Sequence, residues 1–151
     1  MADFRRFELF ADLLTQRFPQ AKRVFDVAGG KGALNAELCK RGLTCLTFDR
    51  RHKHLPVDFA HRDFTLDEPC DADLLVGLHA DGATRVIIEY ALKHQVPFAV
   101  VPCCSDNSMP YKPWMRHLAE LAATGGFAIE EVTMPMQGRA RVLVGVPPPK
   151  A

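Results

Sequence analysis

One short stretch, "VFDVAGGKGALNAEL" at residues 24–38, constrains the fold more than any other. An apolar run with an acid near its end leads into a glycine-rich turn, and the following segment carries Leu34 and Leu38 at helical spacing. Strand, glycine turn and helix in this order form the unit with which α/β proteins bind nucleotides. Gly42 lies where a glycine ends such a helix in the left-handed conformation.

The rest of the chain repeats this alternation of strand and helix. Apolar runs and helical periodicity predict helices at 3–18, 83–94 and 112–126, and strands at 23–28, 43–49, 57–64, 72–79, 97–104, 127–134 and 141–146. Alternation predicts a mostly parallel sheet with helices on both faces, and the hairpin-like end adds an antiparallel strand at one edge. We expect one α/β domain over residues 1–151, with an N-terminal helix within 1–20 and a disordered tail at 147–151.

Composition excludes several functional classes. The formal net charge of +1 gives no overall electrostatic footprint for nucleic acid. No apolar run is long enough to cross a bilayer, and acids interrupt the apolar N-terminus, so neither a membrane span nor a signal peptide is expected. The five cysteines are odd in number and form no CxxC pair, which favours reduced thiols and a cytoplasmic location.

The glycine loop fits one nucleotide-binding pattern better than two others. A P-loop needs Ser or Thr after its lysine, whereas Lys31 is followed by Gly32. A dinucleotide GxGxxG fingerprint needs a third glycine where this chain has Asn35. The remaining pattern, acid-x-Gly-x-Gly-x-Gly counted from Asp26, finds alanine in its first glycine slot and glycine in the other two, Gly30 and Gly32.

Two further acids close the next two strands. Asp49 ends the strand after the loop, where the comparable acid of dinucleotide folds accepts hydrogen bonds from ribose hydroxyls. Asp63 in "HRDF" follows the third strand. The alternative is a solvated strand end for Asp49, a surface acid for Asp63, and a cap or brace of the glycine turn for Asp26.

With "FDVAGGKG", "LTFDRR", "HRDF" and "DADLLVGLHADG" in this order, the chain resembles the class I S-adenosylmethionine-dependent methyltransferases. The last motif, together with "FAVVPCC", is similar to the methyltransferase-like domain of glutathione S-transferase C-terminal-domain-containing proteins and to a family of tRNA ribose methyltransferases. The resemblance spans most of the chain, from residue 20 to residue 146.

The resemblance implies a Rossmann-like three-layer sandwich with strand order 3-2-1-4-5-7-6 and strand 7 antiparallel. It implies S-adenosylmethionine as cofactor, with its methionine end over the glycine loop, its ribose on Asp49 and its adenine near Arg50 and Asp63. It points to RNA as acceptor and to a partner protein that supplies substrate recognition. The cofactor-binding residues expected from it are Asp26, Ala28, Gly29, Gly30, Gly32, Asp49, Arg50, Asp63 and Leu78.

The fourth and fifth strands end in the candidate catalytic and substrate-side residues. His79 can act as a general base or be a satisfied core histidine, and Asp81 occupies the slot where relatives have cysteine. A zinc site that joins His79 to Cys103 and Cys104 is disfavoured, because adjacent strand residues point to opposite faces; no metal is expected. Residues expected on the substrate side are Cys103, Cys104, Ser105 and Asn107.

Three departures from the family pattern support a rival interpretation. Ala28 is harmless in a glycine slot only if its φ is negative. Asp81 replaces a cysteine, and the segment between Asp49 and Asp63 is so short that a crossover helix must be trimmed. The rival is a methyltransferase-fold binding module without catalysis; a nucleotide-binding oxidoreductase is disfavoured by the missing third glycine. The basic run "RRHKH" at 50–54 is either a phosphate contact or a solvated loop.

Overall fold

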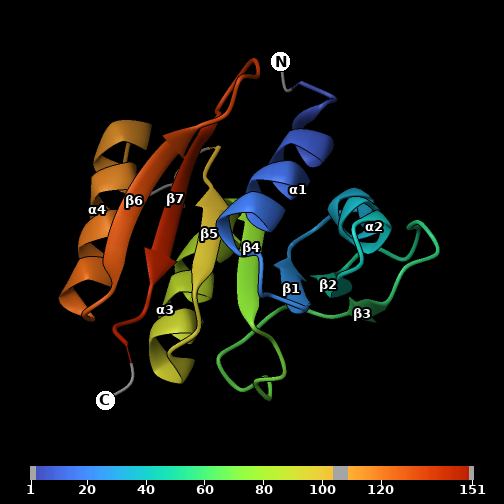
Figure 1. The fold of residues 1–151 in the computed structure, drawn as a ribbon, viewed down its shortest axis with the longest axis horizontal. Helices are drawn as coiled ribbons and strands as arrows, with labels where there is room; N and C mark the ends of the chain where they lie inside the picture. Colours follow the sequence, from blue (N-terminus) through green and yellow to red (C-terminus); the bar gives the residue numbers. More distant parts are fainter. Residues whose placement is uncertain (1–2, 104–108, 150–151) are drawn as a thin grey trace.

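The computed structural model describes residues 3–103 and 109–149 and contains one seven-stranded sheet (Figure 1). The strand order is β3-β2-β1-β4-β5-β7-β6, with β7 antiparallel to both of its neighbours. The order that the resemblance implied is therefore confirmed. The elements are α1 (Arg6–Arg17), β1 (Arg23–Val27), α2 (Ala33–Lys40), β2 (Thr44–Asp49), β3 (Phe59–His61), β4 (Leu74–Leu78), α3 (Thr84–His94), β5 (Phe98–Val101), α4 (Tyr111–Thr124), β6 (Ala128–Thr133) and β7 (Arg141–Val146).

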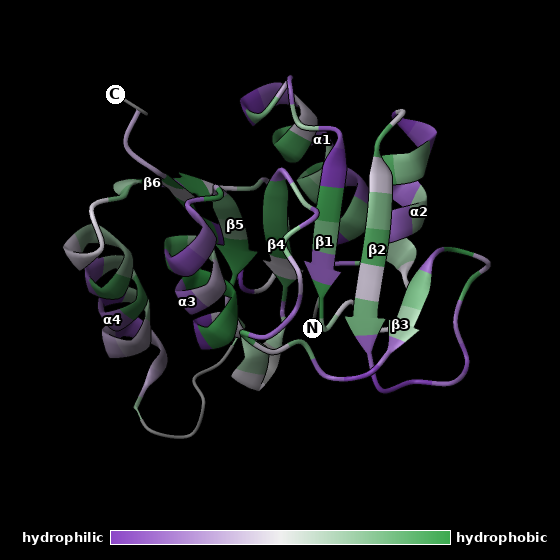
Figure 2. Cartoon of the chain, turned by 90° about the horizontal axis from the view of Figure 1, so that it is seen from below, coloured by the Kyte–Doolittle hydropathy of each residue, from purple (hydrophilic) through white to green (hydrophobic). Residues whose placement is uncertain are grey.

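Helices cover both faces of the sheet, so the predicted three-layer sandwich is confirmed. Helices α1 and α2 bury Phe10, Leu14 and Leu38 against one face. Helices α3 and α4 bury Tyr90 and Trp114 against the other. The central strands β4 and β5 are apolar along their length (Figure 2), as strands covered on both sides must be.

The two crossovers that flank β3 contain no helix; residues 50–58 and 62–73 are all described. The predicted trimming of the crossovers is confirmed. Loop 50–58 packs directly on the glycine loop instead: the Leu55 N–H donates to the Lys31 carbonyl at 2.9 Å. Asn35, which is fully buried, donates from its side-chain amide to the Asp58 carbonyl at 3.1 Å. The residue that breaks the dinucleotide fingerprint therefore anchors the helix-free crossover.

Several element boundaries differ from the sequence-based prediction by one to three residues, and β3 differs most in relation to its length. Strand β3 is much shorter than the expected 57–64, because its partner β2 ends at Asp49 and leaves nothing to pair beyond His61. A short 3-10 turn, Asp81–Ala83, precedes α3. Gly42 has a φ of 88°, which confirms the left-handed helix end. Among the described residues, no helix is long and apolar enough to cross a membrane.

Candidate functional site

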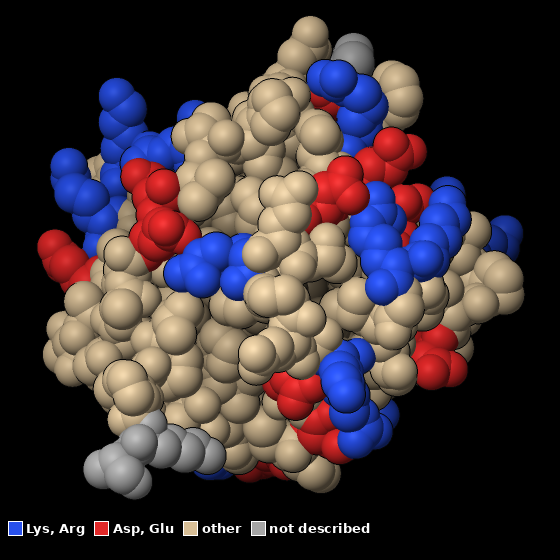
Figure 3. Space-filling view, in the orientation of Figure 1, with Lys and Arg blue, Asp and Glu red and all other residues tan. Residues whose placement is uncertain are grey.

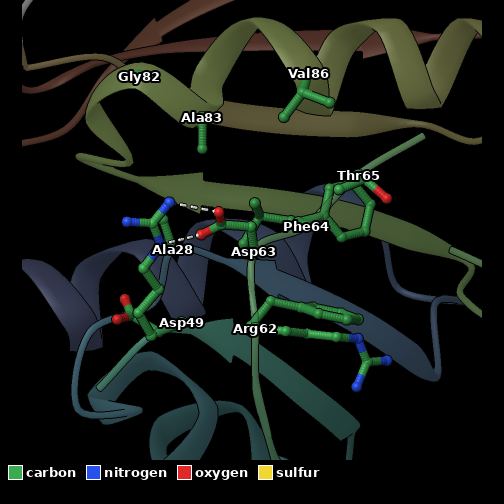
Figure 4. A pocket seen from close by; sticks show the side chains of 12 residues that line it. Ala28, Asp49, Arg62, Asp63, Phe64, Thr65, Gly82, Ala83 and Val86 are labelled. Carbon is green, nitrogen blue, oxygen red and sulfur yellow. Dashed lines mark hydrogen bonds and ion pairs between the residues drawn. The ribbon is translucent and has the colours of Figure 1, made fainter. Parts of the chain in front are cut away.

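Two cavities open at the carboxyl ends of the central strands, and Ala28 and Asp49 line both of them. The first has a volume of about 670 Å³ and the second about 520 Å³, which is the size range of small-molecule sites. They lie where the chain runs from β1 to β2 on one side and from β4 to β5 on the other. Ligands of open α/β sheets bind at this switch of direction. Figure 4 shows the first cavity, whose other lining residues include Phe48, Arg50, Arg62, Asp63, Phe64, Thr65, Gly82, Ala83 and Val86.

The glycine loop between β1 and α2 alternates in backbone conformation. Ala28, Gly30 and Gly32 have φ values of 54°, 63° and 87°, so all three slots of the acid-x-Gly-x-Gly-x-Gly pattern are left-handed. This geometry explains why the pattern asks for glycine at every second position. The condition under which Ala28 would be harmless is not met, and its methyl group costs about 1–2 kcal/mol in this conformation.

Asp26 lies beneath the loop. Its side chain is 1% exposed, its Oδ2 accepts a hydrogen bond of 2.9 Å from the Thr47 hydroxyl, and its Oδ1 has no partner in the described chain. Burial raises the pKa of Asp26 to about 7; the Thr47 hydrogen bond opposes this rise and the charge of Asp49 adds to it. A Cβ on Gly29 would lie 2.1 Å from Asp26 Oδ2, so only glycine can pass over this carboxyl group.

Asp49 holds the loop from the side. Its Oδ2 accepts a hydrogen bond of 2.8 Å from the Gly30 N–H, and its Oδ1 accepts one of 3.1 Å from the Arg51 N–H. The side chain is 18% exposed and lies where the two cavities meet. Each carboxylate oxygen has a second lone pair, so Asp49 can accept further hydrogen bonds from a ligand.

The two residues expected near adenine contact each other. Arg50 and Asp63 form a two-pronged ion pair at the rim of the first cavity, with both N–O distances at 2.6 Å (Figure 4). The Arg50 hydrogen bonds lower the pKa of Asp63. With side chains 80% and 57% exposed, the pair is screened by water and adds little stability, so a ligand can open it at little cost.

The second cavity carries positive charge that the sequence analysis did not identify. Lys31 comes from the glycine loop, Arg51 from loop 50–58, and Arg6 from the start of α1. Helix α1 packs against α2, which brings residues near the N-terminus over the loop. No pattern in the sequence announces this contact, because it depends on how two helices pack.

His79 follows β4 and lines the second cavity together with Leu78. Its φ is 56°, so His79 and Ala28 are two residues other than glycine that are left-handed at this edge of the sheet. The ring Nε2 lies 2.9 Å from the Arg139 carbonyl in the β6–β7 connection. A carbonyl only accepts, so Nε2 carries the proton and Nδ1 of the neutral ring keeps its lone pair.

Other candidates are only partly defined. Asp81 begins the 3-10 turn, and Cys103 is half-buried after β5. Cys104, Ser105 and Asn107 lie outside the described residues. Within residues 3–103 and 109–149, no group of three His, Cys, Asp or Glu side chains is positioned to hold a metal ion.

Solved structures share this arrangement of strands and helices. The sugar N-methyltransferase KedS8 from Streptoalloteichus matches with a TM-score of 0.68 and 14% identity, over 97% of this chain and 88% of its own. Human N-acetylserotonin methyltransferase, solved in complex with SAM, matches with a TM-score of 0.63 and 18% identity, over 95% of this chain and 51% of its own. The chain has the class I methyltransferase fold. No family model matches the sequence.

One curated protein matches the methyltransferase-fold chain in sequence. It is a probable tRNA (uracil-O(2)-)-methyltransferase of Caenorhabditis elegans, 31% identical over 103 residues. The match covers 59% of this chain and 18% of that protein, so the chain spans less than a fifth of its relative's length.

Proposed function

We propose that the chain binds S-adenosylmethionine and transfers its methyl group to an acceptor. The observation that carries the proposal is the meeting of two cavities at Asp49, beside a left-handed loop. The first cavity has apolar walls from Phe48 and Phe64 and suits a nucleoside. The second is lined by cations and suits the carboxylate of an amino acid. S-Adenosylmethionine has both parts in one molecule.

The loop residues fit this cofactor. A Cβ on Gly30 would find no atom closer than Arg51 Nε at 3.8 Å, so the loop is open above Gly30 while Asp26 closes it from below. Asp49 would accept hydrogen bonds from the ribose hydroxyls. Arg6 would meet the carboxylate.

The sulfonium group supplies an electrophilic methyl when the cofactor is bound. The chain's own contribution is to orient the acceptor and to remove its proton. His79 is the proposed general base, through Nδ1, because Nε2 is already engaged with Arg139. We also propose a catalytic role for Asp81, because it follows His79 by two residues at the same edge of the sheet.

We propose RNA as the acceptor and the cytoplasm as the location. The name of the Caenorhabditis elegans relative supports RNA. The small share of that relative which this chain spans supports a partner protein that supplies substrate recognition. Free thiols at the described Cys39, Cys45 and Cys70 support a reducing compartment.

Calorimetric titration with S-adenosylmethionine and S-adenosylhomocysteine tests the proposal. We expect saturable binding that Asp49→Ala abolishes. Asp73→Ala is the matched control, because Asp73 also accepts two backbone hydrogen bonds, from the Lys22 and Arg23 N–H groups, but at the opposite end of β1. No heat up to millimolar ligand would favour the rival binding module, which the strained Ala28 supports. Binding of NADH instead would revive an oxidoreductase.

A further inference from the structure

Four aromatic rings gather on loop 50–58 and β3, and we call them the ring platform: His52, His54, Phe59 and His61. His54 stacks on Phe59 with ring centres 3.9 Å apart and planes 7° from parallel. His61 lies 5.1 Å from His54, 5.0 Å from Phe59 and 5.5 Å from His52. The rings therefore form one continuous surface.

The platform is exposed because a loop replaces the crossover helix there. His52 and His61 are exposed, whereas His54 in loop 50–58 and Phe59 on the edge strand β3 are half-buried. The His54 Nδ1–H donates to the Leu55 carbonyl at 2.6 Å, which fixes the ring over Phe59. A helix at this place would bury such rings.

Cations accompany the platform. Arg51 and Lys53 alternate with its histidines, and Lys31 lies under the loop through the hydrogen bond to Leu55. Lys31 and Lys53 form no ion pair within the described chain. Arg50 is neutralised by Asp63 at 2.6 Å, whereas Arg51 lies 3.8 Å from Asp49, at the long end of the ion-pair range, and its side chain is 57% exposed. Lys and Arg side chains gather on the right of Figure 3, over and beside α2, with acids between them.

The platform is continuous with the proposed cofactor site. His61 lies opposite Asp49 in the β2–β3 register, so an exposed ring is next to the residue that joins the two cavities. Arg51 lines the second cavity and approaches the glycine loop near Gly30. A chain lying on the rings would reach the cavity without a gap.

We propose that the ring platform binds a single-stranded nucleic acid, with bases stacked on the rings and phosphates on Lys31, Arg51 and Lys53. Exposed rings suit unpaired bases because a duplex hides its base faces. The described residues offer no metal-binding group that would explain the histidines. The inference rests on the proposed function in one respect: it makes this surface the place where the acceptor strand approaches.

The test is fluorescence anisotropy with a labelled RNA strand of about 12 nucleotides, within the site sizes of known stacking surfaces. Three further ligands serve as comparisons: a duplex of the same sequence, the corresponding DNA strand, and heparin as a competing polyanion. We expect the single strand to bind best, with a salt slope of about 2 from three cations. Tighter binding of RNA than of DNA would support the proposal and show that the 2′-hydroxyl is also recognised. Equal binding of the two strands would support stacking alone.

Variants separate stacking from charge. His52→Ala/His61→Ala removes two exposed rings and should weaken single-strand binding at least about tenfold, since each stacked base contributes about fivefold or more. Arg51→Gln/Lys53→Gln should lower the salt slope by about 1.4. The matched control is Lys22→Gln/Arg116→Gln, which removes the same charge from exposed positions elsewhere and should change binding little.

Unchanged binding by the two-histidine variant would overturn the proposal, as would duplex or heparin binding equal to the single strand. The same purified variants show whether the platform proposal or the proposed methyltransferase function has failed. The two-histidine variant should keep wild-type affinity for S-adenosylmethionine, and Asp49→Ala should lose that affinity while it still binds RNA. Absence of cofactor binding with intact RNA binding would count against the methyltransferase, not against the platform.

Discussion

The carboxylate of Asp49 accepts a hydrogen bond of 2.8 Å from the backbone N–H of Gly30. This bond joins the end of β2 to the loop that follows β1, at the place where the two cavities meet. One side chain therefore holds the loop and lines both cavities, where we propose that the cofactor binds. The two roles can be separated by substitution.

Asp49→Asn and Asp49→Ala should differ in stability more than in ligand binding. The asparagine oxygen can still accept from Gly30, so we expect a small stability loss, whereas alanine should lose about 1.5–3 kcal/mol as a hydrogen bond to a charged group disappears. Both should weaken S-adenosylmethionine binding at least about tenfold, because neither presents a carboxylate to the ribose. Urea unfolding and calorimetry on the same samples measure the two effects. Equal stability losses would show that the Gly30 bond does not organise the loop.

Ala28→Gly should stabilise the chain and improve ligand binding together. Glycine removes about 1–2 kcal/mol of left-handed strain and returns about 0.4–1 kcal/mol as entropy of the unfolded chain, for a net gain of about 0.5–1 kcal/mol. Gln95→Gly is the control, since Gln95 has a φ of 55° at the end of α3, away from both cavities. We expect similar midpoint shifts in urea for both variants and tighter cofactor binding only for Ala28→Gly. A destabilised Ala28→Gly would contradict the strain argument.

The sequence predicted what depends on local periodicity. Apolar spacing located the helices and strands, and alternation predicted a mostly parallel sheet whose carboxyl edge carries the site. The glycine pattern marks positions that need a positive φ, and the backbone at residues 28, 30 and 32 is indeed left-handed.

What the sequence could not predict depends on the path of loops and the packing of helices. Arg50 and Asp63 were both expected near adenine, but their ion pair follows from the course of two helix-free crossovers. Arg6 enters the second cavity only because α1 packs on α2. Asn35 was interpreted as a missing glycine, while its buried amide in fact fastens loop 50–58. Contacts between residues that are far apart in the chain leave no periodic pattern in the sequence.

Asp26 should make stability depend on pH between about 4 and about 7. Its folded pKa is about 7, above the roughly 3.9 of an unfolded aspartate, so the folded chain retains a proton that the unfolded chain has lost. The stability due to this proton is fully present below about pH 4 and is lost as pH rises through about 7. Asp26→Asn cannot ionise and should flatten the urea-unfolding profile over this range. A flat wild-type profile would contradict the raised pKa of Asp26.

His79→Asn should separate catalysis from cofactor binding. Asparagine tolerates the left-handed backbone and has no basic nitrogen, but its amide reaches only the position of Nδ1, so the bond from Nε2 to the Arg139 carbonyl is lost as well. We expect cofactor affinity within about threefold of wild type and methyl incorporation into total RNA lowered about 100-fold, the usual contribution of a positioned general base. Calorimetry measures the affinity, and methyl transfer from tritiated cofactor measures the rate. If the variant kept the wild-type rate, His79 would be a structural link between β4 and the β6–β7 connection, and proton removal would belong to another group or to solvent.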